Sequence, residues 1–496
     1  MNTKNSMTIR QFTALLILML PIFFGCRGEE MHQETPPNII LIVADDLGYG
    51  DLGVYGQEQI QTPNLDRMAG EGIRFLQHYS GSTVCAPSRS VLMTGLHSGH
   101  TPIRGNKEIF PIGQYPMPYG FYTLSGLLQE AGYATGGFGK WGLGYPGSEG
   151  MPSLHGFDRF FGYLGQRRAH FYYPEFLFSD VKGEELKRVN LEGNRVSDAP
   201  NHPGSGIPEA AETYAPDVIH DAAVQFLNEN RNRPFFLYYP SPIPHASLEV
   251  PEAYLEPYLD ENGESIFDET AFPGAHYAPQ SMPIATYAAM VSYLDERVGD
   301  LMNRIDSLGL SEKTLFIFTS DNGSHSEAGY HYSMLSSNGD LRGGKRDLYE
   351  GGIRVPMIMR WPGTIDEGRL TDHISGFQDL LPTLAGAAGI DLPVSVDGIS
   401  MMPLLTETGK QPAHNYLYWE FHEQGGKQAI RKGDWKAVRL GVIGDPEAQP
   451  ELYNLAKDPG EEANVASDYP DQTSEMMRLM NDARVPSEIF KLFQNE

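Results

Sequence analysis

The sequence predicts an α/β protein built on a large, mostly parallel sheet flanked by helices, with a smaller antiparallel sheet and a helix near the C-terminus. Two continuous apolar runs, "NIILIVADD" (38–46) and "TLFIFTSDNG" (314–323), have the pattern of strands buried on both faces. Amphipathic segments alternate with such runs, which is typical of helices packed on both sides of a parallel sheet. The 496 residues suffice for one large domain and an appended smaller one.

The remaining elements follow from their local patterns. Further strands are predicted over 233–239 and 355–361, and helices over 62–72, 215–231 and 287–309, the first with Thr62 as N-cap and Pro63 at its first position. After residue 389 the pattern of apolar and polar residues changes, and the segments 428–440 and 451–466 predict a small antiparallel sheet with a terminal helix. We therefore expect a main domain over 36–400 and a C-terminal subdomain over 401–496.

The N-terminus has the pattern of a secretory signal over residues 1–26. Lys4 and Arg10 precede an apolar run (12–24) that is shorter than the roughly 20 residues a membrane span needs. Gly25 and Cys26 then resemble the cleavage and lipidation site of a bacterial lipoprotein. We expect export to the periplasm or cell surface of a bacterium, with Cys26 as a lipid tether to a membrane. The alternative is an ordinary signal peptide that takes Cys26 with it.

The acidic charge balance argues against polyanionic partners. The net charge of −27 argues against nucleic acid or an anionic bilayer face as a ligand. Without the leader, Cys85 is the single cysteine, so the mature chain can form no internal disulfide.

Cys85 lies in "STVCAPSRSVLMTG", where Pro87 suits the first position of a helix that ends at Gly95. Cys85 would then lie just ahead of a helix N-terminus with Arg89 close by, a setting that favours an anion. The alternative is a buried structural cysteine.

Polar residues follow both apolar runs at their carboxyl ends. These ends meet at one edge of a parallel sheet, so the two pairs are expected to form one site. Oxygen donors of this kind suit a hard cation such as calcium or magnesium rather than zinc. Either pair alone could be ordinary loop or N-cap chemistry. The four residues are Asp45, Asp46, Asp321 and Asn322.

Two lysines and a histidine are further candidates. Lys140 in "GGFGKWGLG" and Lys345 in "LRGGKRDLYEGG" lie in glycine-rich loops, where a lysine can approach an anion closely. His245 in "SPIPHAS" follows a predicted strand and could act as an acid or base. Each of them, taken alone, could equally be an ordinary solvated loop residue.

Together these motifs resemble the signature of the type I, formylglycine-dependent sulfatases of the alkaline phosphatase superfamily. "CAPSR" followed by Met93, Thr94 and Gly95 resembles the family pattern C-x-P-S-R with a later L-T-G. The resemblance covers roughly residues 36 to 490 and includes "ADDLGYGDLG", "GKWGLG", "FTSDNG", "GGKRDLYEGGIRVP" and "ELYNLAKDPGEEANVA".

The resemblance implies that hydrolysis of a sulfate ester uses Cα-formylglycine, made from Cys85 by a separate maturing enzyme. Arg89 would steady the formylglycine, Lys140 and Lys345 would neutralise sulfate oxygens, and His245 would protonate the leaving alcohol. One Ca²⁺ would be held by the formylglycine at position 85 and by four other residues, Asp45, Asp46, Asp321 and Asn322.

One position departs from the family pattern. Many relatives carry a histidine where this chain has Gly142, so the base that releases the intermediate is in doubt. His97, His100 or water are the alternatives.

The segment 162–178 predicts the specificity. It combines Arg168 and His170 with aromatic residues suited to a sugar, which predicts a sulfated saccharide, with galactose or N-acetylgalactosamine favoured. The segment could also be an ordinary packed connector. The alternative functions are a phosphatase or phosphonate hydrolase of the same superfamily, or a catalytically silent glycan-binding protein.

Overall fold

The computed structural model describes residues 1–2, 36–110, 113–199 and 202–493. The predicted signal segment, including Cys26, lies outside the described residues. Residues 36–496 cluster as one compact unit. Among the described residues, no helix is both long and apolar enough to cross a bilayer.

A ten-stranded sheet forms the centre of this unit. Strand β1 (Asn38–Ala44) lies between β13 (Thr314–Ser320) and β12 (Phe235–Pro240), and β6 (Ala134–Lys140) follows β12, with all four strands parallel. Every residue of β1 is buried because helices cover both faces of the sheet. Both flanks of the sheet contain antiparallel pairs. Beyond β6 the sheet continues through β7 (Arg159–Tyr163), β8 (Phe176–Val181) and β9 (Lys187–Asn190). Beyond β13 it continues through β14 (Met357–Arg360), β2 (Ile73–Phe75) and β15 (Arg369–Thr371).

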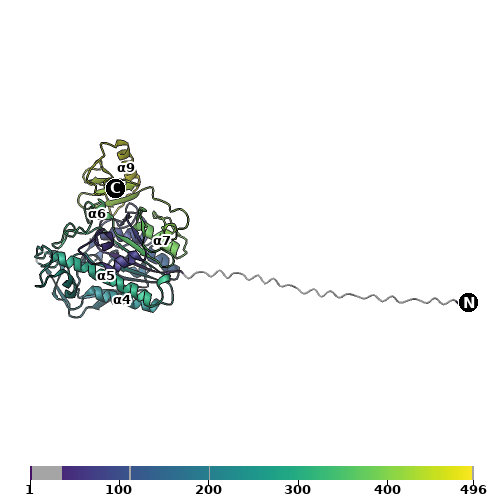
Figure 1. Cartoon of the computed structure of the whole chain (residues 1–496), viewed down its shortest axis with the longest axis horizontal. Helices are drawn as coiled ribbons and strands as arrows, with labels where there is room; N and C mark the ends of the chain where they lie inside the picture. The colour runs from purple at the N-terminus through teal and green to yellow at the C-terminus, as the bar shows by residue number, and fades with distance from the viewer. Residues whose placement is uncertain (3–35, 111–112, 200–201, 494–496) are drawn as a thin grey trace. The chain divides into compact units, whose positions relative to one another are not determined.

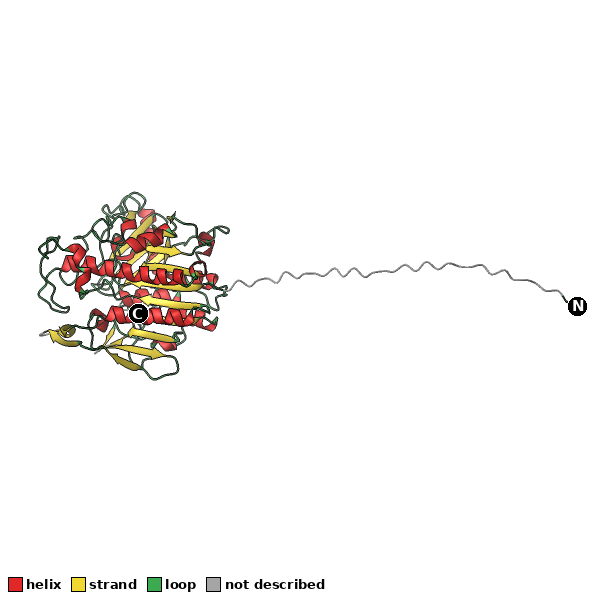
Figure 2. Cartoon of the chain, turned by 60° about the horizontal axis from the view of Figure 1, so that its bottom comes forward, coloured by secondary structure: helices red, strands yellow, loops and turns green. Residues whose placement is uncertain are grey.

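Alternate side chains of β1 enter two separate cores. Ile40 and Ile42 pack with helices α1 (Pro63–Gly70), α4 (Ala215–Asn230) and α5 (Pro283–Ser307). Ile39 and Leu41 pack with α2 (Cys85–Thr94), α3 (Leu124–Glu130) and α7 (Leu380–Ala387) on the opposite face. Figure 1 shows α4 and α5 running side by side, and Figure 2 shows the strands lying between the helices. The predicted fold class is confirmed.

Two helix starts differ from the sequence prediction. Helix α5 begins at Pro283, four residues before the predicted start, because a proline is well tolerated at the first helical position. Helix α2 begins at Cys85, so the cysteine is its first residue and does not precede it. Pro87 is then the third residue, where its missing N–H costs no intrahelical bond. The predicted end at Gly95 is confirmed, with a left-handed φ of 68°.

A four-stranded antiparallel sheet and a helix complete the chain, as predicted. This sheet runs in the order β17 (Leu417–Phe421), β18 (Lys427–Lys432), β19 (Trp435–Leu440) and β20 (Glu451–Asn454), and α9 (Pro470–Asp482) packs on β18 and β19. The boundary near residue 400 stays a prediction. The remaining strands and α-helices are β3 (His78–Tyr79), β4 (Glu108–Ile109), β5 (Gly113–Gln114), β10 (Arg195–Ala199), β11 (His202–Ala210), β16 (Ser375–Gly376), α6 (Glu350–Ile353) and α8 (Met402–Leu405).

A buried charge cluster fastens this small sheet to the segment before β14. Lys436 of β19 lies 2.9 Å from Glu350 of α6 and 2.9 Å from Glu461, and none of the three side chains is exposed. Burial would raise the pKa of Glu350, but Lys436, together with Arg431 and Arg354, outweighs that effect and lowers the pKa to about 2. The lysine therefore compensates carboxylates that could not otherwise stay charged in the interior.

We expect Lys436→Met to destabilise the protein by about 3–5 kcal/mol, because it removes the ion pair of buried Glu461 and leaves buried Glu350 with the longer pair to Arg354. Urea unfolding followed by circular dichroism measures the loss. The matched control is Lys432→Met on the neighbouring strand, whose ion pair with Glu475 is solvent-exposed and is expected to contribute far less. Equal effects of the two substitutions would contradict this account.

Candidate active site

The predicted acids meet at the carboxyl edge of the sheet. Asp45 and Asp46 follow β1, Asp321 and Asn322 follow β13, and the parallel register pairs Ala44 with Ser320 directly before them. The Asp46 backbone N–H donates to Asp321 Oδ1 at 3.2 Å, and Asn322 Nδ2 donates to Asp46 Oδ1 at 2.7 Å. All four side chains are fully buried. Two strand ends 275 residues apart in the sequence therefore form one cluster of oxygen ligands.

Cys85 contacts this cluster from the first turn of α2. Its Sγ donates to Asp45 Oδ1 at 3.3 Å and lies 3.4 Å from Lys140 Nζ. Burial, followed by the negative charge of Asp45, raises the pKa of the thiol well above its usual range despite the nearby lysine. The unmodified side chain is therefore held as a thiol, which is a poor nucleophile compared with a thiolate.

Arg89 and Lys140 bring positive charge to the same cluster, although Lys140 is the last residue of strand β6 and does not lie in a loop as expected from the sequence. Arg89 lies one helical turn after Cys85, and its Nε and Nη2 donate to Asp321 Oδ2 at 3.1 and 2.7 Å. Its Nη1 donates to the carbonyl of Lys140, and Lys140 Nζ pairs with Asp45. Burial would raise the pKa of Asp45, but Lys140 and Arg89 outweigh it and hold that pKa far below its usual value. Asp45 is thus charged at neutral pH.

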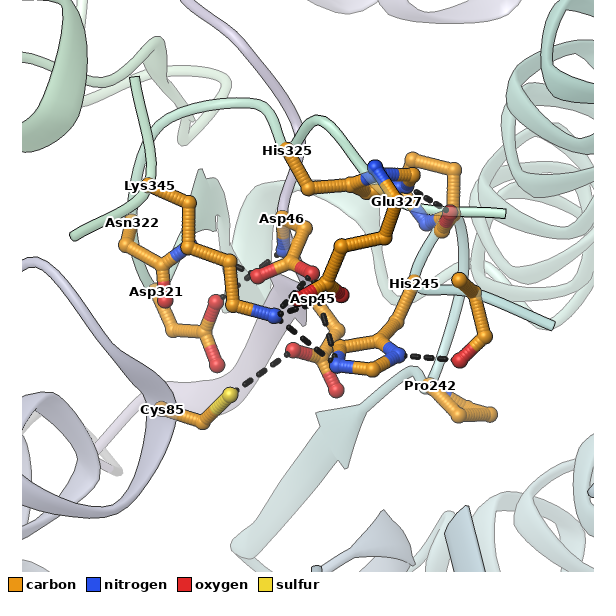
Figure 3. Close-up of polar contacts among 12 residues, drawn as sticks. Asp45, Asp46, Cys85, Pro242, His245, Asp321, Asn322, His325, Glu327 and Lys345 are labelled. Atoms are coloured by element: carbon orange, nitrogen blue, oxygen red, sulfur yellow. Dashed lines mark hydrogen bonds and ion pairs between the residues drawn. The ribbon is translucent and has the colours of Figure 1, made fainter. Parts of the chain in front are cut away.

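Lys345 and His245 lie next to each other beside Asp46 (Figure 3). Lys345 Nζ lies 2.8 Å from Asp46 Oδ2 and 3.0 Å from His245 Nε2. His245 Nδ1 donates to the carbonyl of Ala246, so its Nε2 is the lone-pair nitrogen that accepts from Lys345. Burial, together with the charge of Lys345, lowers the pKa of His245 well below its usual value, so the ring is neutral.

Glu327 belongs to the site but was missed by the sequence analysis. Its carboxylate lies 3.3 Å from Lys345 Nζ, pairs with Arg346 at 2.7 Å and accepts from Tyr277 Oη at 2.8 Å. Burial would raise its pKa, but Lys345 and its other cationic neighbours hold it well below its usual range. The available signal was its place five residues after Asn322, in the loop that follows the carboxyl end of β13.

His325 precedes Glu327 in the same loop and was also missed. Its ring is fully buried, and its Nε2 lies 3.2 Å from the carbonyl of Pro244. Because Pro244 directly precedes His245, this contact joins the loop after β13 to the loop after β12. His325 therefore helps to fix the site without touching its centre.

The two predicted substrate-binding residues have different surroundings. The His170 ring stacks on His245, with centroids 4.3 Å apart and an angle of 13° between the planes, and also faces Tyr277 at 5.6 Å. Arg168 lies over the Phe176 ring at 4.0 Å. His170 is therefore in contact with the site, whereas the contacts of Arg168 are with aromatic side chains of its own segment. Both roles stay predictions.

Gly142 is coupled to Gln166. A Cβ at Gly142 would lie 2.4 Å from Gln166 Nε2 and 3.5 Å from Arg89 Cδ, and the backbone has a left-handed φ of 75°. Gln166 Nε2 donates to the Gly142 carbonyl at 3.3 Å, and its buried Oε1 has no hydrogen-bond partner among the described residues. The glutamine amide thus occupies the space that a side chain at position 142 would enter.

His97 and His100 form a separate cluster around Asp397. Their rings stack at 4.2 Å, and His100 Nδ1 lies 2.9 Å from Asp397 Oδ2. Among the described residues, each of the two histidines forms its ion pair with Asp397 and not with the carboxylates around Cys85.

The strand-end cluster fits a hard metal ion. The ligand atoms of Asp45, Asp46, Cys85 and His245 lie within 4.8 Å of one another. Burial and the neighbouring Asp45 charge raise the pKa of Asp321 to about 7, so the carboxylates lack sufficient positive charge. Asn322 Oδ1 is buried and has no hydrogen-bond partner among the described residues. An oxygen-rich set with an unpaired carbonyl is suited to a cation such as calcium.

Comparison with known proteins agrees with this geometry. The family model described as Sulfatase matches residues 37–390, and the model described as N-sulphoglucosamine sulphohydrolase, C-terminal, matches residues 343–485. The chain is 34% identical to human arylsulfatase A, over 90% of this chain and 86% of that protein. It is 29% identical to the N-acetylgalactosamine-6-O-sulfatase of Bacteroides thetaiotaomicron, over 95% of this chain and 98% of that protein.

A solved structure is similar along the same length. The crystal structure of Ps i-CgsB in complex with k-i-k-neocarrahexaose superposes with a TM-score of 0.72 and 28% identity, covering 90% of this chain and 92% of that one. The chain therefore belongs to the sulfatase family and is a sulfuric ester hydrolase with an alkaline phosphatase-like fold.

Proposed function

We propose that this protein hydrolyses a sulfate ester on a glycan, using one Ca²⁺ and a formylglycine made from Cys85. The observation that carries the proposal is the convergence of Lys140, Arg89 and Lys345 on a buried acidic cluster beside Cys85. A tetrahedral anion repels nucleophiles, and fixed cations in a water-poor site offset that repulsion as charge develops in the transition state. A structural cysteine would need none of these charges.

The residues present fit both absent groups. Asp45, Asp46, Asp321 and Asn322 would hold the ion, which would act as a Lewis acid toward a sulfate oxygen. A hydrated formylglycine at position 85 would offer two hydroxyls, one to attack sulfur and one for release of the sulfate, whereas a thiol or a serine offers a single group. The raised pKa of the Cys85 thiol is consistent with a side chain that must be modified before it can react.

His245 is placed to deliver a proton to the departing alcohol, and Lys345 is placed to offset negative charge beside it. Lys345 Nζ donates to the lone pair of His245 Nε2 at 3.0 Å. Despite burial, Asp46 and Glu327 hold the pKa of Lys345 well above its usual value, so Lys345 keeps its proton. His245 Nε2, after taking a proton from solvent, can pass that proton to the ester oxygen as the bond to sulfur breaks. Lys140 and Arg89 stay charged and hold the negative site around Cys85 in place.

A sulfated saccharide is the substrate class we propose, with galactose or N-acetylgalactosamine at the ester. Support comes from the N-acetylgalactosamine-6-O-sulfatase relative and from the neocarrahexaose complex of Ps i-CgsB. His170, stacked on His245 beside Tyr277, is a suitable wall for a sugar ring. The signal segment with Cys26 supports export as a periplasmic or surface lipoprotein.

The formylglycine is tested by peptide mass analysis after co-expression with a maturing enzyme. We expect the peptide around Cys85 to show the mass loss for a thiol converted to an aldehyde, and sulfated saccharides to be hydrolysed only by modified protein. Cys85→Ala should lower kcat at least 10³-fold, because it removes the nucleophile. The panel includes the matching phosphate esters. Faster cleavage of phosphate than of sulfate would reject the proposed substrate class, as would full activity of protein carrying unmodified Cys85.

Calcium is tested by chelation. Exhaustive treatment with EGTA should abolish hydrolysis and lower the unfolding temperature, because the buried carboxylates then repel one another, and added Ca²⁺ should restore both. Lys345→Ala is the control: it should lose activity but keep the Ca²⁺-dependent rise in unfolding temperature. If EGTA changes neither the activity nor the unfolding temperature, the protein does not use the proposed ion.

Glu327 is expected to position Lys345. Once Asp46 binds a metal, Glu327 is the other carboxylate within ion-pair distance of Lys345 among the described residues. Glu327→Gln should lower kcat about tenfold, equivalent to about 1.4 kcal/mol, with little change in KM. Glu229→Gln, which alters an exposed ion pair with Arg159, is the matched control and should leave both constants unchanged. Steady-state kinetics on one sulfated saccharide measure both, and an unchanged kcat for Glu327→Gln refutes the positioning role.

A further inference from the structure

A cavity outside the active site is lined by exposed aromatic side chains. It has a volume of about 250 Å³ and lies between the loop before α3, α3 itself and the segment at Leu154. Tyr119, Phe121 and Tyr122 are 59%, 37% and 39% exposed, and Leu154 is 48% exposed. Large apolar side chains gathered at the surface around a hollow mark a binding site more often than single exposed ones do.

The backbone of this cavity is firmly held. Thr123 caps α3 by accepting from the Gly126 N–H at 3.1 Å, and its hydroxyl donates to the carbonyl of His155 at 2.8 Å. Tyr119 N donates to Glu149 at 3.0 Å. The aromatic rings are therefore presented on a fixed frame, which lowers the entropy that a ligand must overcome on binding.

The polar groups at the cavity restrict the chemistry of its ligand. Glu130 is an exposed carboxylate at the end of α3, whereas the Gln129 side chain is already bound to Asp158 and Lys182. No lysine or arginine is among the described residues that line the cavity. Glu130 is the carboxylate among the described residues that line the cavity, so it would repel a sulfated or other anionic group placed beside it, in a protein of net charge −27.

We propose that this cavity binds an uncharged sugar residue of a glycan, at a distance from the reacting ester. Aromatic faces stack against the C–H face of a pyranose, and the carboxylate and phenol groups can hydrogen-bond its hydroxyls. The mixed polar and aromatic lining and the small volume favour a saccharide over a protein partner, whose interface would need a far larger surface. The inference rests on the proposed action on a glycan and adds a second contact with the same polymer.

Binding is measured with the full-length Cys85→Ala variant, so that hydrolysis plays no part. Isothermal titration uses three neutral hexasaccharides: unsulfated neoagarohexaose, xylohexaose and cellohexaose. We expect at least one to bind, and the double substitution Tyr119→Ala/Tyr122→Ala to weaken its Kd at least tenfold while the circular dichroism spectrum stays unchanged. Phe110→Ala is the matched control, because Phe110 is 75% exposed but does not line the cavity, and its Kd should equal that of the parent.

A second substitution tests the charge argument. Glu130→Lys should allow a sulfated hexasaccharide to bind at the cavity of the His245→Ala/Cys85→Ala protein, whereas Glu130→Gln should keep the preference for the neutral one. The proposal is overturned if none of the hexasaccharides binds, if the double substitution leaves Kd unchanged, or if light scattering shows that the same substitutions dissociate a dimer. A failure of the proposed glycan sulfatase activity would give a different result. In that case the hexasaccharide would still bind at the cavity, but wild-type protein carrying the modified Cys85 would release no sulfate.

Discussion

The crowding of three buried carboxylates at one point is the constraint on which the rest of this site depends. Asp45, Asp46 and Asp321 are all fully buried at the ends of two paired strands. Three like charges cannot be confined there without positive groups, and the raised pKa of Asp321, about 7, reflects the deficit that remains. Arginine and lysine side chains therefore converge on these acids from three other segments of the chain.

The same charges explain why the fold is arranged as it is around this edge. Lys140 is the last residue of β6, and Arg89 lies on α2, so a strand and a helix are joined at Asp45 and Asp321. The carboxylates hold the lysine and arginine side chains in position before a substrate binds. A site that is already arranged in this way stabilises charge in a transition state without further reorganisation.

The sequence was sufficient for the residues whose local pattern is tied to an element. Apolar runs that end in acids place Asp45 and Asp321 at strand ends, and Gly95 ends a helix that carries Arg89. It was insufficient for Glu327 and Tyr277, because their roles arise from contacts between loops 50 residues apart. The start of α2 was also misplaced, since a proline is tolerated at more than one position in the first turn.

Gly142 is the clearest case of a residue that cannot be interpreted from the sequence alone. Read alone, a glycine at this position indicates a missing catalytic group. In the folded chain it is one half of a pair, because Gln166 Nε2 stands 2.4 Å from where a Cβ would lie. A side chain at 142 would require the end of the Gln166 side chain to move, so the two positions are interpreted together. Where this chain has a glycine, a loop 24 residues away supplies a buried amide whose carbonyl oxygen has no hydrogen-bond partner among the described residues. A substitution at Gly142 would therefore have to displace the Gln166 amide and also adopt a left-handed φ of 75°.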